Sequence, residues 1–153
     1  MIVLPSVEDT RAFGTRLASL LRPGDLVILN GPLGAGKTAL TQGIGAGLQV
    51  SGDVTSPTFV IARVHRGPVP LVHVDAYRLR HLEIDDLDLD ASVEDSVTVV
   101  EWGAGKAERL ADSYLEIRLS RRDDDTREVE LIPHGEDWQS RVMSLADLPN
   151  APV

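Results

Sequence analysis

The feature that most constrains the fold of this chain is residues 31–38, GPLGAGKT, which match the pattern G-x-x-x-x-G-K-[ST] in full. Residues 26–29 before it form a short apolar run that predicts a buried strand, and residues 39–48 after it can continue as a helix. A strand, a glycine-rich turn and a helix in this order are the context in which the pattern indicates a phosphate-binding loop. Backbone N–H groups of the loop and of the first helical turn would surround a phosphate chain. Lys37 would reach the β- and γ-phosphates, and Thr38 would offer its hydroxyl to Mg²⁺. The sequence therefore predicts a nucleoside triphosphate site.

The composition is that of an ordinary globular chain with an acidic balance. The 153 residues are most simply one domain, which we expect to span residues 1–147 and to be followed by a frayed tail at 148–153. No cysteine is present, which excludes disulfides and thiolate metal sites. Because the chain shows no export signal and no run of the ~18 apolar residues that cross a bilayer, we expect a cytoplasmic protein without a membrane partner. The net charge of −9 disfavours direct, tight binding to nucleic acid, since phosphates repel such a surface.

Apolar runs and turn signals predict an α/β fold. We expect a single P-loop NTPase domain whose mixed parallel and antiparallel sheet is flanked by helices and carries β-hairpins. The expected strands are an edge strand at 2–4, the strand at 26–29, a hairpin of 59–64 with 71–74, a buried strand at 97–100, and a hairpin of 114–119 with 128–132.

Helices are predicted at three places along the chain. Ser6 and Asp9 resemble a capping box at the start of the first helix, the second helix follows the loop, and residues 138–145 fit a short closing helix. Three glycines of the second helix, Gly43, Gly45 and Gly47, each cost about 1 kcal/mol relative to alanine. Close packing against the sheet could explain them, although the sequence alone does not show it.

Two predicted strands end on a carboxylate, Asp75 after residues 71–74 and Glu101 after residues 97–100. If both strands run parallel to residues 26–29, their side chains emerge on the same edge of the sheet as Lys37. One acid would then hold Mg²⁺ directly or through water, and the other would assist or position the attacking water. The alternative for each acid alone is a turn-forming residue at a strand end.

Several neighbouring residues have two interpretations. The hydroxyls of Ser56 and Thr58 can sense a γ-phosphate from a switch-like loop, or they can cap a local turn. A lone Trp102 is more often a core residue than a ligand contact. His65 and His73 are interpreted as strand residues without a catalytic role.

Four elements of the sequence occur in one order and carry a family resemblance. They are residues 31–38, Ser56-Pro57-Thr58-Phe59, His73-x-Asp75-x-Tyr77-Arg78-Leu79 and Glu101-Trp102. Together they resemble the TsaE family, the bacterial ATPases of tRNA threonylcarbamoyladenosine biosynthesis, over about residues 4–131. The resemblance implies a small ATPase that uses ATP and Mg²⁺, is slow alone, and works with TsaD and TsaB proteins. The resemblance further implies that the ATPase does not transfer the threonylcarbamoyl group itself and that its ATP cycle resets the TsaD–TsaB assembly between turnovers.

The resemblance also implies roles for individual positions. The residues that would wrap the phosphates are Gly34, Ala35, Gly36, Lys37, Thr38 and Ala39. Thr38, Glu101 and the Walker-B-like Asp75 would hold the metal, and Lys37, Asp75 and Glu101 would carry the catalysis. Thr58 and Trp102 would line the site or its switch. Arg127 would lie near the nucleotide, and the backbone around Val7 would meet the adenine.

Two other classes of protein share such a loop. A small-molecule or nucleotide kinase normally adds an Arg-rich lid and an acceptor pocket, whereas the later half of this chain reads as hairpins and an acidic stretch at 83–95. A non-hydrolysing, nucleotide-gated adaptor is the other alternative, and Glu101 argues against it. A GTPase is disfavoured because no N-K-x-D element is present.

Overall fold

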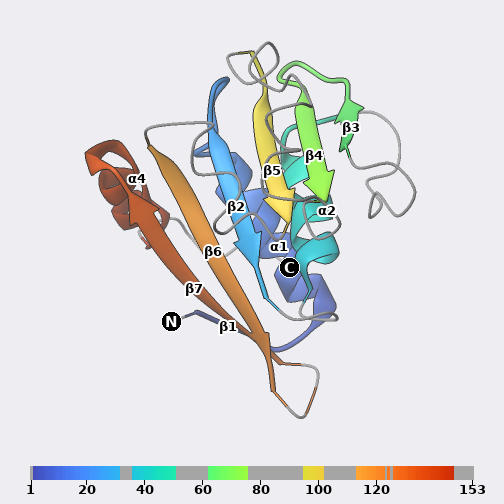
Figure 1. Cartoon of the computed structure of the whole chain (residues 1–153). Coiled ribbons are helices and arrows are strands. Elements are labelled where there is room, and N and C mark those ends of the chain that lie inside the picture. Colours follow the sequence, from blue (N-terminus) through green and yellow to red (C-terminus); the bar gives the residue numbers. More distant parts are fainter. Residues whose placement is uncertain are drawn as a thin grey trace.

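One sheet organises the part of the chain that the computed structural model describes, which is residues 2–31, 36–50, 62–75, 95–101, 113–122, 124 and 126–146. Within these residues seven strands lie in the order β1-β7-β6-β2-β5-β4-β3 (Figure 1). The strands are β1 (Ile2–Leu4), β2 (Leu26–Asn30), β3 (Ala62–His65), β4 (Leu71–Asp75), β5 (Val97–Glu101), β6 (Tyr114–Arg121) and β7 (Arg127–His134). The helices are α1 (Val7–Ala18), α2 (Lys37–Gly47) and α4 (Glu136–Ala146). The expected tail at 148–153 lies outside the described residues, so the domain bounds stay a prediction.

The sheet is mixed, which confirms the predicted fold class. Strand β2 runs parallel to both β5 and β6, and β4 runs parallel to β5, while the remaining pairs are antiparallel. The edge strand and both hairpins are present. The second hairpin is longer than predicted at both ends, because its ladder extends to the pair Arg121 and Arg127 and to the pair Tyr114 and His134. Backbone pairing tolerates the charged side chains that end the apolar alternation in the sequence. The first hairpin is described from Ala62 onward, so residues 59–61 lie outside the described part.

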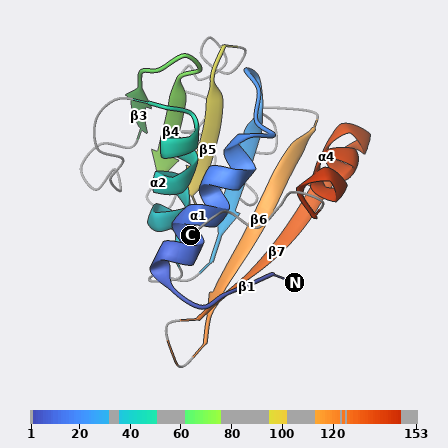
Figure 2. The same cartoon turned by 180° about the vertical axis from the view of Figure 1, so that it is seen from behind.

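The core lies between the sheet and helices α1 and α2, which cover one face of it (Figure 2). Alternate residues of the central strands point to this face, because successive side chains of a strand point to opposite sides. The strand residues that contribute to this core are Val27, Leu29, Leu71, Val97, Val99, Leu115, Ile117, Leu119 and Val129. Helix α1 begins with the predicted capping box: the Asp9 N–H donates to Oγ of Ser6 over 3.2 Å, and the Ser6 N–H donates to the Asp9 carboxylate over 3.0 Å.

Glycines bring helices α1 and α2 into backbone contact. A Cβ atom at Gly43 would lie 2.1 Å from the carbonyl oxygen of Arg11, and one at Gly14 would lie 2.4 Å from the carbonyl oxygen of Leu40. The hydroxyl of Thr15 donates to the Gly43 carbonyl over 3.1 Å, across the same contact. The interpretation that Gly43 packs against the sheet was therefore wrong, because the close neighbour of this glycine is the backbone of α1.

Helix α4 closes the other end of the core, as the pattern at 138–145 predicted. Trp138 is buried, and the buried guanidinium of Arg141 donates to the carboxylates of Asp25 and Asp137 and to the carbonyl of Leu20. Burial lowers the pKa of Arg141, but its hydrogen bonds to the two carboxylates outweigh burial and raise this pKa. The ion pair with Asp25 ties α4 to the turn before β2, whereas the pair with Asp137 lies within the helix. Among the described helices, none has the length and apolar character needed to cross a membrane.

Candidate nucleotide site

The carboxyl ends of three parallel strands meet at one edge of the sheet. Glu101, the last residue of β5, is the register partner of Leu29 in β2 and of Asp75 in β4. The backbone leaves β2 at this edge and returns at Lys37 as the start of α2. In Figure 1 the arrowheads of β2, β4 and β5 point the same way, toward this edge. The structure therefore places the backbones of both acids on the rim from which the loop departs, an arrangement that the sequence predicted only on the condition that these strands are parallel.

The start of α2 has the properties of an anion site. Gly36 takes a φ of +103°, a left-handed conformation that favours glycine, and it precedes the helix without a side-chain cap. No acidic residue lies in the first turn of α2, so its N–H groups and the positive end of the helix dipole face the loop. Lys37 is 6% exposed, and its Nζ donates to the carbonyl oxygen of Gly31 over 2.7 Å. The ammonium group is thus folded back across the loop. Thr38 and Ala39 follow in the same turn.

Glu101 is a buried carboxylate in contact with a buried histidine. Its side chain is 5% exposed, and Oε2 lies 2.7 Å from Nε2 of His73, whose side chain is fully buried. Because His73 is the register partner of Val99, two residues before Glu101, the two side chains share the face of the sheet that α2 covers. The interpretation of His73 from sequence did not anticipate this contact.

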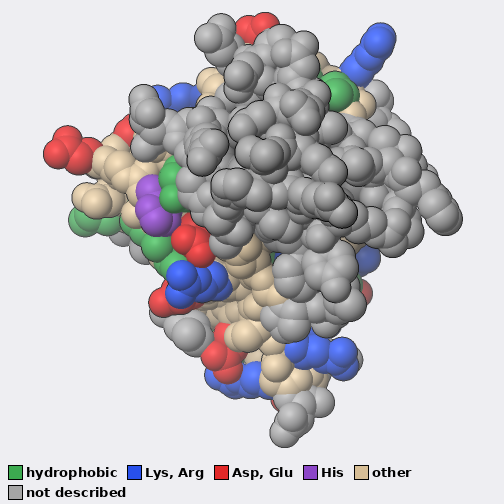
Figure 3. All heavy atoms as spheres, viewed as in Figure 1, with side chains coloured by type: hydrophobic (Ala, Val, Ile, Leu, Met, Phe, Trp, Pro, Cys, Tyr) green, Lys and Arg blue, Asp and Glu red, His purple; other side chains and the backbone are tan. Residues whose placement is uncertain are grey.

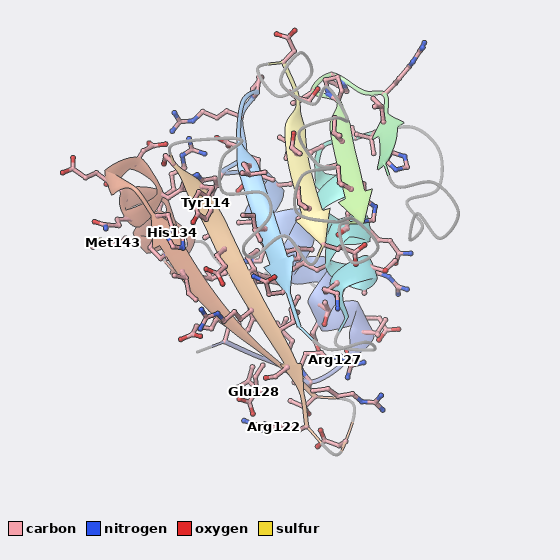
Figure 4. All side chains as sticks on the ribbon, in the orientation of Figure 1. Tyr114, Arg122, Arg127, Glu128, His134 and Met143 are labelled. Carbon is pink, nitrogen blue, oxygen red and sulfur yellow. The ribbon has the colours of Figure 1, made fainter. Side chains whose placement is uncertain are left out.

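Arg127 reaches the loop from a distant part of the chain. Strand β6 runs parallel to β2, so the end of the β6–β7 hairpin lies at the same edge as the loop. A Cβ atom at Gly36 would lie 3.4 Å from Nε of Arg127, which is buried against this glycine. Arg127 is also the register partner of Leu4, at the end of β1, and Val7 begins α1 three residues later. Figure 4 shows Arg127 at this hairpin end of the molecule. The starts of α1 and α2 and the hairpin therefore converge.

The other predicted site residues are not described. Gly34, Ala35, Thr58 and Trp102 lie outside the described residues, as does Ser56. For Asp75 the structure describes the backbone position alone. Their roles stay predictions.

The residues present fit Mg²⁺ and a triphosphate. Mg²⁺ prefers oxygen ligands, and it is usually held by one or two carboxylates together with substrate phosphates. The carboxylate of Glu101 and the hydroxyl of Thr38 are oxygen donors of this kind, and α2 and Lys37 supply the positive charge that phosphates need. Among the described side chains, no three His, Asp or Glu residues cluster to hold a metal alone.

A second histidine–glutamate pair lies on the opposite face of the sheet. Glu116 is the register partner of Ile28 and therefore points away from the face of Glu101, which pairs with Leu29. It accepts hydrogen bonds from His134 over 3.1 Å and from Arg118 and Asn30. His134 also stacks on the ring of Tyr114 (Figure 4), and Figure 3 shows a histidine gathered with acidic and basic side chains on this side.

This second pair predicts a pH dependence of stability. Burial raises the pKa of Glu116, but hydrogen bonds from His134, Arg118 and Asn30 outweigh burial and lower it below the usual value of 4.5. A carboxyl group whose pKa is lower in the folded state stabilises the fold above its unfolded pKa, and this contribution is lost as the pH falls through the folded pKa. We expect the stability advantage of the native protein over Glu116→Gln to be present above pH 4.5 and to decrease as the pH falls below 4.5. Urea unfolding of both proteins across this range measures it, and an advantage independent of pH would contradict it.

Comparisons with known proteins place this site in a family context. The family model for the threonylcarbamoyl adenosine biosynthesis protein TsaE matches residues 4–129. A Streptomyces coelicolor protein named tRNA threonylcarbamoyladenosine biosynthesis protein TsaE is 57% identical, covering 88% of this chain and 97% of its own length. A Bacillus subtilis protein of the same name is 38% identical, covering 86% and 84%. The crystal structure of Bacillus subtilis YdiB is similar with a TM-score of 0.81 at 31% identity, over 95% of this chain and 93% of that one.

Proposed function

The chain belongs to the TsaE family of tRNA threonylcarbamoyladenosine biosynthesis, and from this premise we propose that it is a Mg²⁺-dependent ATPase that cycles a TsaD–TsaB transferase assembly. The observation that carries the proposal is the parallel register of β2, β4 and β5. This register puts Glu101 and the backbone of Asp75 on the edge where the loop begins and where Lys37 starts α2. One acid at this rim can hold the Mg²⁺ of a bound nucleotide, and a second acid supplies the group that hydrolysis needs to orient water.

The proposed mechanism relies on positioning and electrostatics. The N–H groups at the start of α2 and the ammonium of Lys37 bind the β- and γ-phosphates and stabilise charge that develops on them. Mg²⁺, held by Thr38, Glu101 and Asp75, would neutralise charge on the phosphate oxygens. One of the two carboxylates orients the attacking water, while Arg127, packed on Gly36, adds a positive charge beside the loop. The backbone around Val7 would meet the adenine.

The proposed partners are TsaD-like and TsaB-like proteins. The support is family membership, together with the acidic balance of this chain. A protein with a net charge of −9 is a poor ligand for the tRNA backbone, so we assign tRNA binding to another subunit of the assembly.

Hydrolysis measured with and without purified TsaD and TsaB tests the proposal. We expect slow release of phosphate by the protein alone, stimulation by the partners, and loss of ATP binding by at least about tenfold in Lys37→Ala, because this variant removes a charged phosphate contact worth at least about 1.4 kcal/mol. Arg22→Ala is a matched control, because Arg22 is exposed and lies before β2, at the opposite edge of the sheet. Transfer of the γ-phosphate to a metabolite faster than hydrolysis would contradict the proposal and favour a kinase.

A further inference from the structure

The contact between His73 and Glu101 has no part in the mechanism proposed above. Both side chains are buried in adjacent parallel strands, and their polar atoms Nε2 and Oε2 lie 2.7 Å apart. This distance is typical of a hydrogen bond to an ionised group. Glu101 is the acid that the proposed function assigns to the metal and to water, so its orientation matters for both.

The hydrogen-bond pattern assigns a proton position to the ring. A carboxylate can only accept, so the hydrogen of this contact is on Nε2 of His73. Nδ1 is buried and has no hydrogen-bond partner among the described residues. The Nε2–H group of His73 is therefore the donor in this contact, and Oε2 of Glu101 is the acceptor.

Packing alone does not explain a histidine at this position. Leu71 and Val99, both buried, lie beside His73 on the same face of the sheet, and an apolar side chain would fill the same space without burying two ring nitrogens. The polar atom that has a partner is Nε2, and that partner is Oε2 of Glu101. The imidazole ring at this position therefore holds one oxygen of the Glu101 carboxylate by a hydrogen bond.

We propose that His73 is a positioning residue that holds Oε2 of Glu101, so that Oε1 is directed to the Mg²⁺–nucleotide. This inference rests on the proposed function. Ligating side chains commonly depend on such hydrogen-bond partners, and loss of a partner typically costs 10- to 100-fold in metal affinity or activity. The proposal gives His73 no contact with the substrate and no proton to transfer.

Two variants of His73 separate positioning from packing. His73→Leu removes the donor, and we expect it to lower kcat about 10- to 100-fold and to weaken ATP binding in Mg²⁺ but not in EDTA. His73→Gln places an amide N–H close to the position of Nε2, so we expect it to recover most of the activity. In a Glu101→Gln background, His73→Leu should have little further effect, because both changes act on the same carboxylate.

Nucleotide binding supplies a measurement that does not depend on turnover. Titration calorimetry with a non-hydrolysable ATP analogue, in Mg²⁺ and in EDTA, gives the gain in affinity that the metal provides. We expect this gain to be about tenfold smaller in His73→Leu than in the native protein and to recover in His73→Gln. His134→Leu is the matched control, since it breaks the histidine–glutamate pair on the opposite face. It should change neither kcat nor the gain in affinity.

The outcomes distinguish this inference from the proposed function. The proposed role of His73 would be overturned if His73→Leu kept the native kcat and the native increase in nucleotide affinity on addition of Mg²⁺. It would also be overturned if the Leu and Gln variants lost kcat and this increase in affinity equally. If His73→Leu does not fold, His73→Asn replaces it, because its shorter amide does not reach Oε2 and should resemble the loss of the donor. If the native protein binds the Mg²⁺–nucleotide without hydrolysing it, the proposal of ATPase activity is contradicted. The increase in nucleotide affinity that Mg²⁺ provides then still tests the role of His73. If Mg²⁺ does not increase the affinity of the native protein for the nucleotide, both the proposed function and the role of His73 are contradicted.

Discussion

Replacing Glu101 with glutamine is expected to lower kcat for ATP hydrolysis by about 100-fold or more, while the protein remains folded and still binds ATP. Glutamine has the shape of glutamate and keeps an oxygen that can accept the hydrogen bond from His73. It loses the negative charge that would hold Mg²⁺ and orient the attacking water. Single-turnover and steady-state measurements of phosphate release give kcat, and calorimetry confirms binding.

Glu116→Gln is the control for this change. Glu116 is also a partly buried strand glutamate that contacts a histidine, but it points to the other face of the sheet. We expect this control to hydrolyse ATP at the native rate. Native turnover in Glu101→Gln would contradict the assignment of Glu101 and favour the nucleotide-gated adaptor that the sequence left as an alternative.

Replacing Gly43 with alanine is expected to destabilise the fold by about 2 kcal/mol or more, which corresponds to a fall in melting temperature of about 4–8 °C. Helix propensity alone would favour alanine by about 1 kcal/mol. The added methyl group, however, would lie 2.1 Å from the carbonyl oxygen of Arg11 and 2.8 Å from its carbonyl carbon. These are backbone atoms of α1, so the clash can be relieved only by moving the two helices apart.

Ala46→Gly serves as the comparison, because Ala46 is an exposed position of the same helix. There we expect the ordinary preference of a helix for alanine, about 1 kcal/mol. Alanine is thus expected to be favoured at position 46 and disfavoured at position 43, as read from urea unfolding of both variants. A stabilised Gly43→Ala protein would show that the helices do not approach as closely as described.

Local patterns were sufficient for much of the fold. The turn between 26–29 and 39–48, the capping box of Ser6 and Asp9, and both hairpins depend on residues that lie near one another in sequence, and period-two or helical patterning reveals such elements. The sequence did not determine whether β4 and β5 run parallel to β2, because an apolar run contains no information on the direction of the neighbouring strand. The sequence was therefore sufficient to identify the two carboxylates but not to show that they lie at the same edge of the sheet.

Contacts between distant segments could not be predicted in this way. Nothing near residues 114–121 indicates that β6 inserts beside β2, yet this insertion brings Arg127 against Gly36. Position 127 came from the family resemblance alone. His73 reads as an ordinary buried strand residue because its partner is 28 positions away. The signal that could have found it is the parallel pairing of two strands that both end on an acid, which places a residue near the end of one strand beside the acid of the other.

The close approach of α1 and α2 limits how far these two helices can move relative to each other. Their backbones touch at Gly14 and Gly43, and a hydroxyl of α1 bonds to a carbonyl of α2, so neither helix can slide or tilt without the other. One of these helices carries Lys37 at its start, and the other begins at Val7. Under the proposed function, the starts of these two helices would hold the phosphates and the adenine of a bound nucleotide at a fixed separation. Under the proposed function, a shape change on hydrolysis would thus move this helix pair as one body or arise outside it.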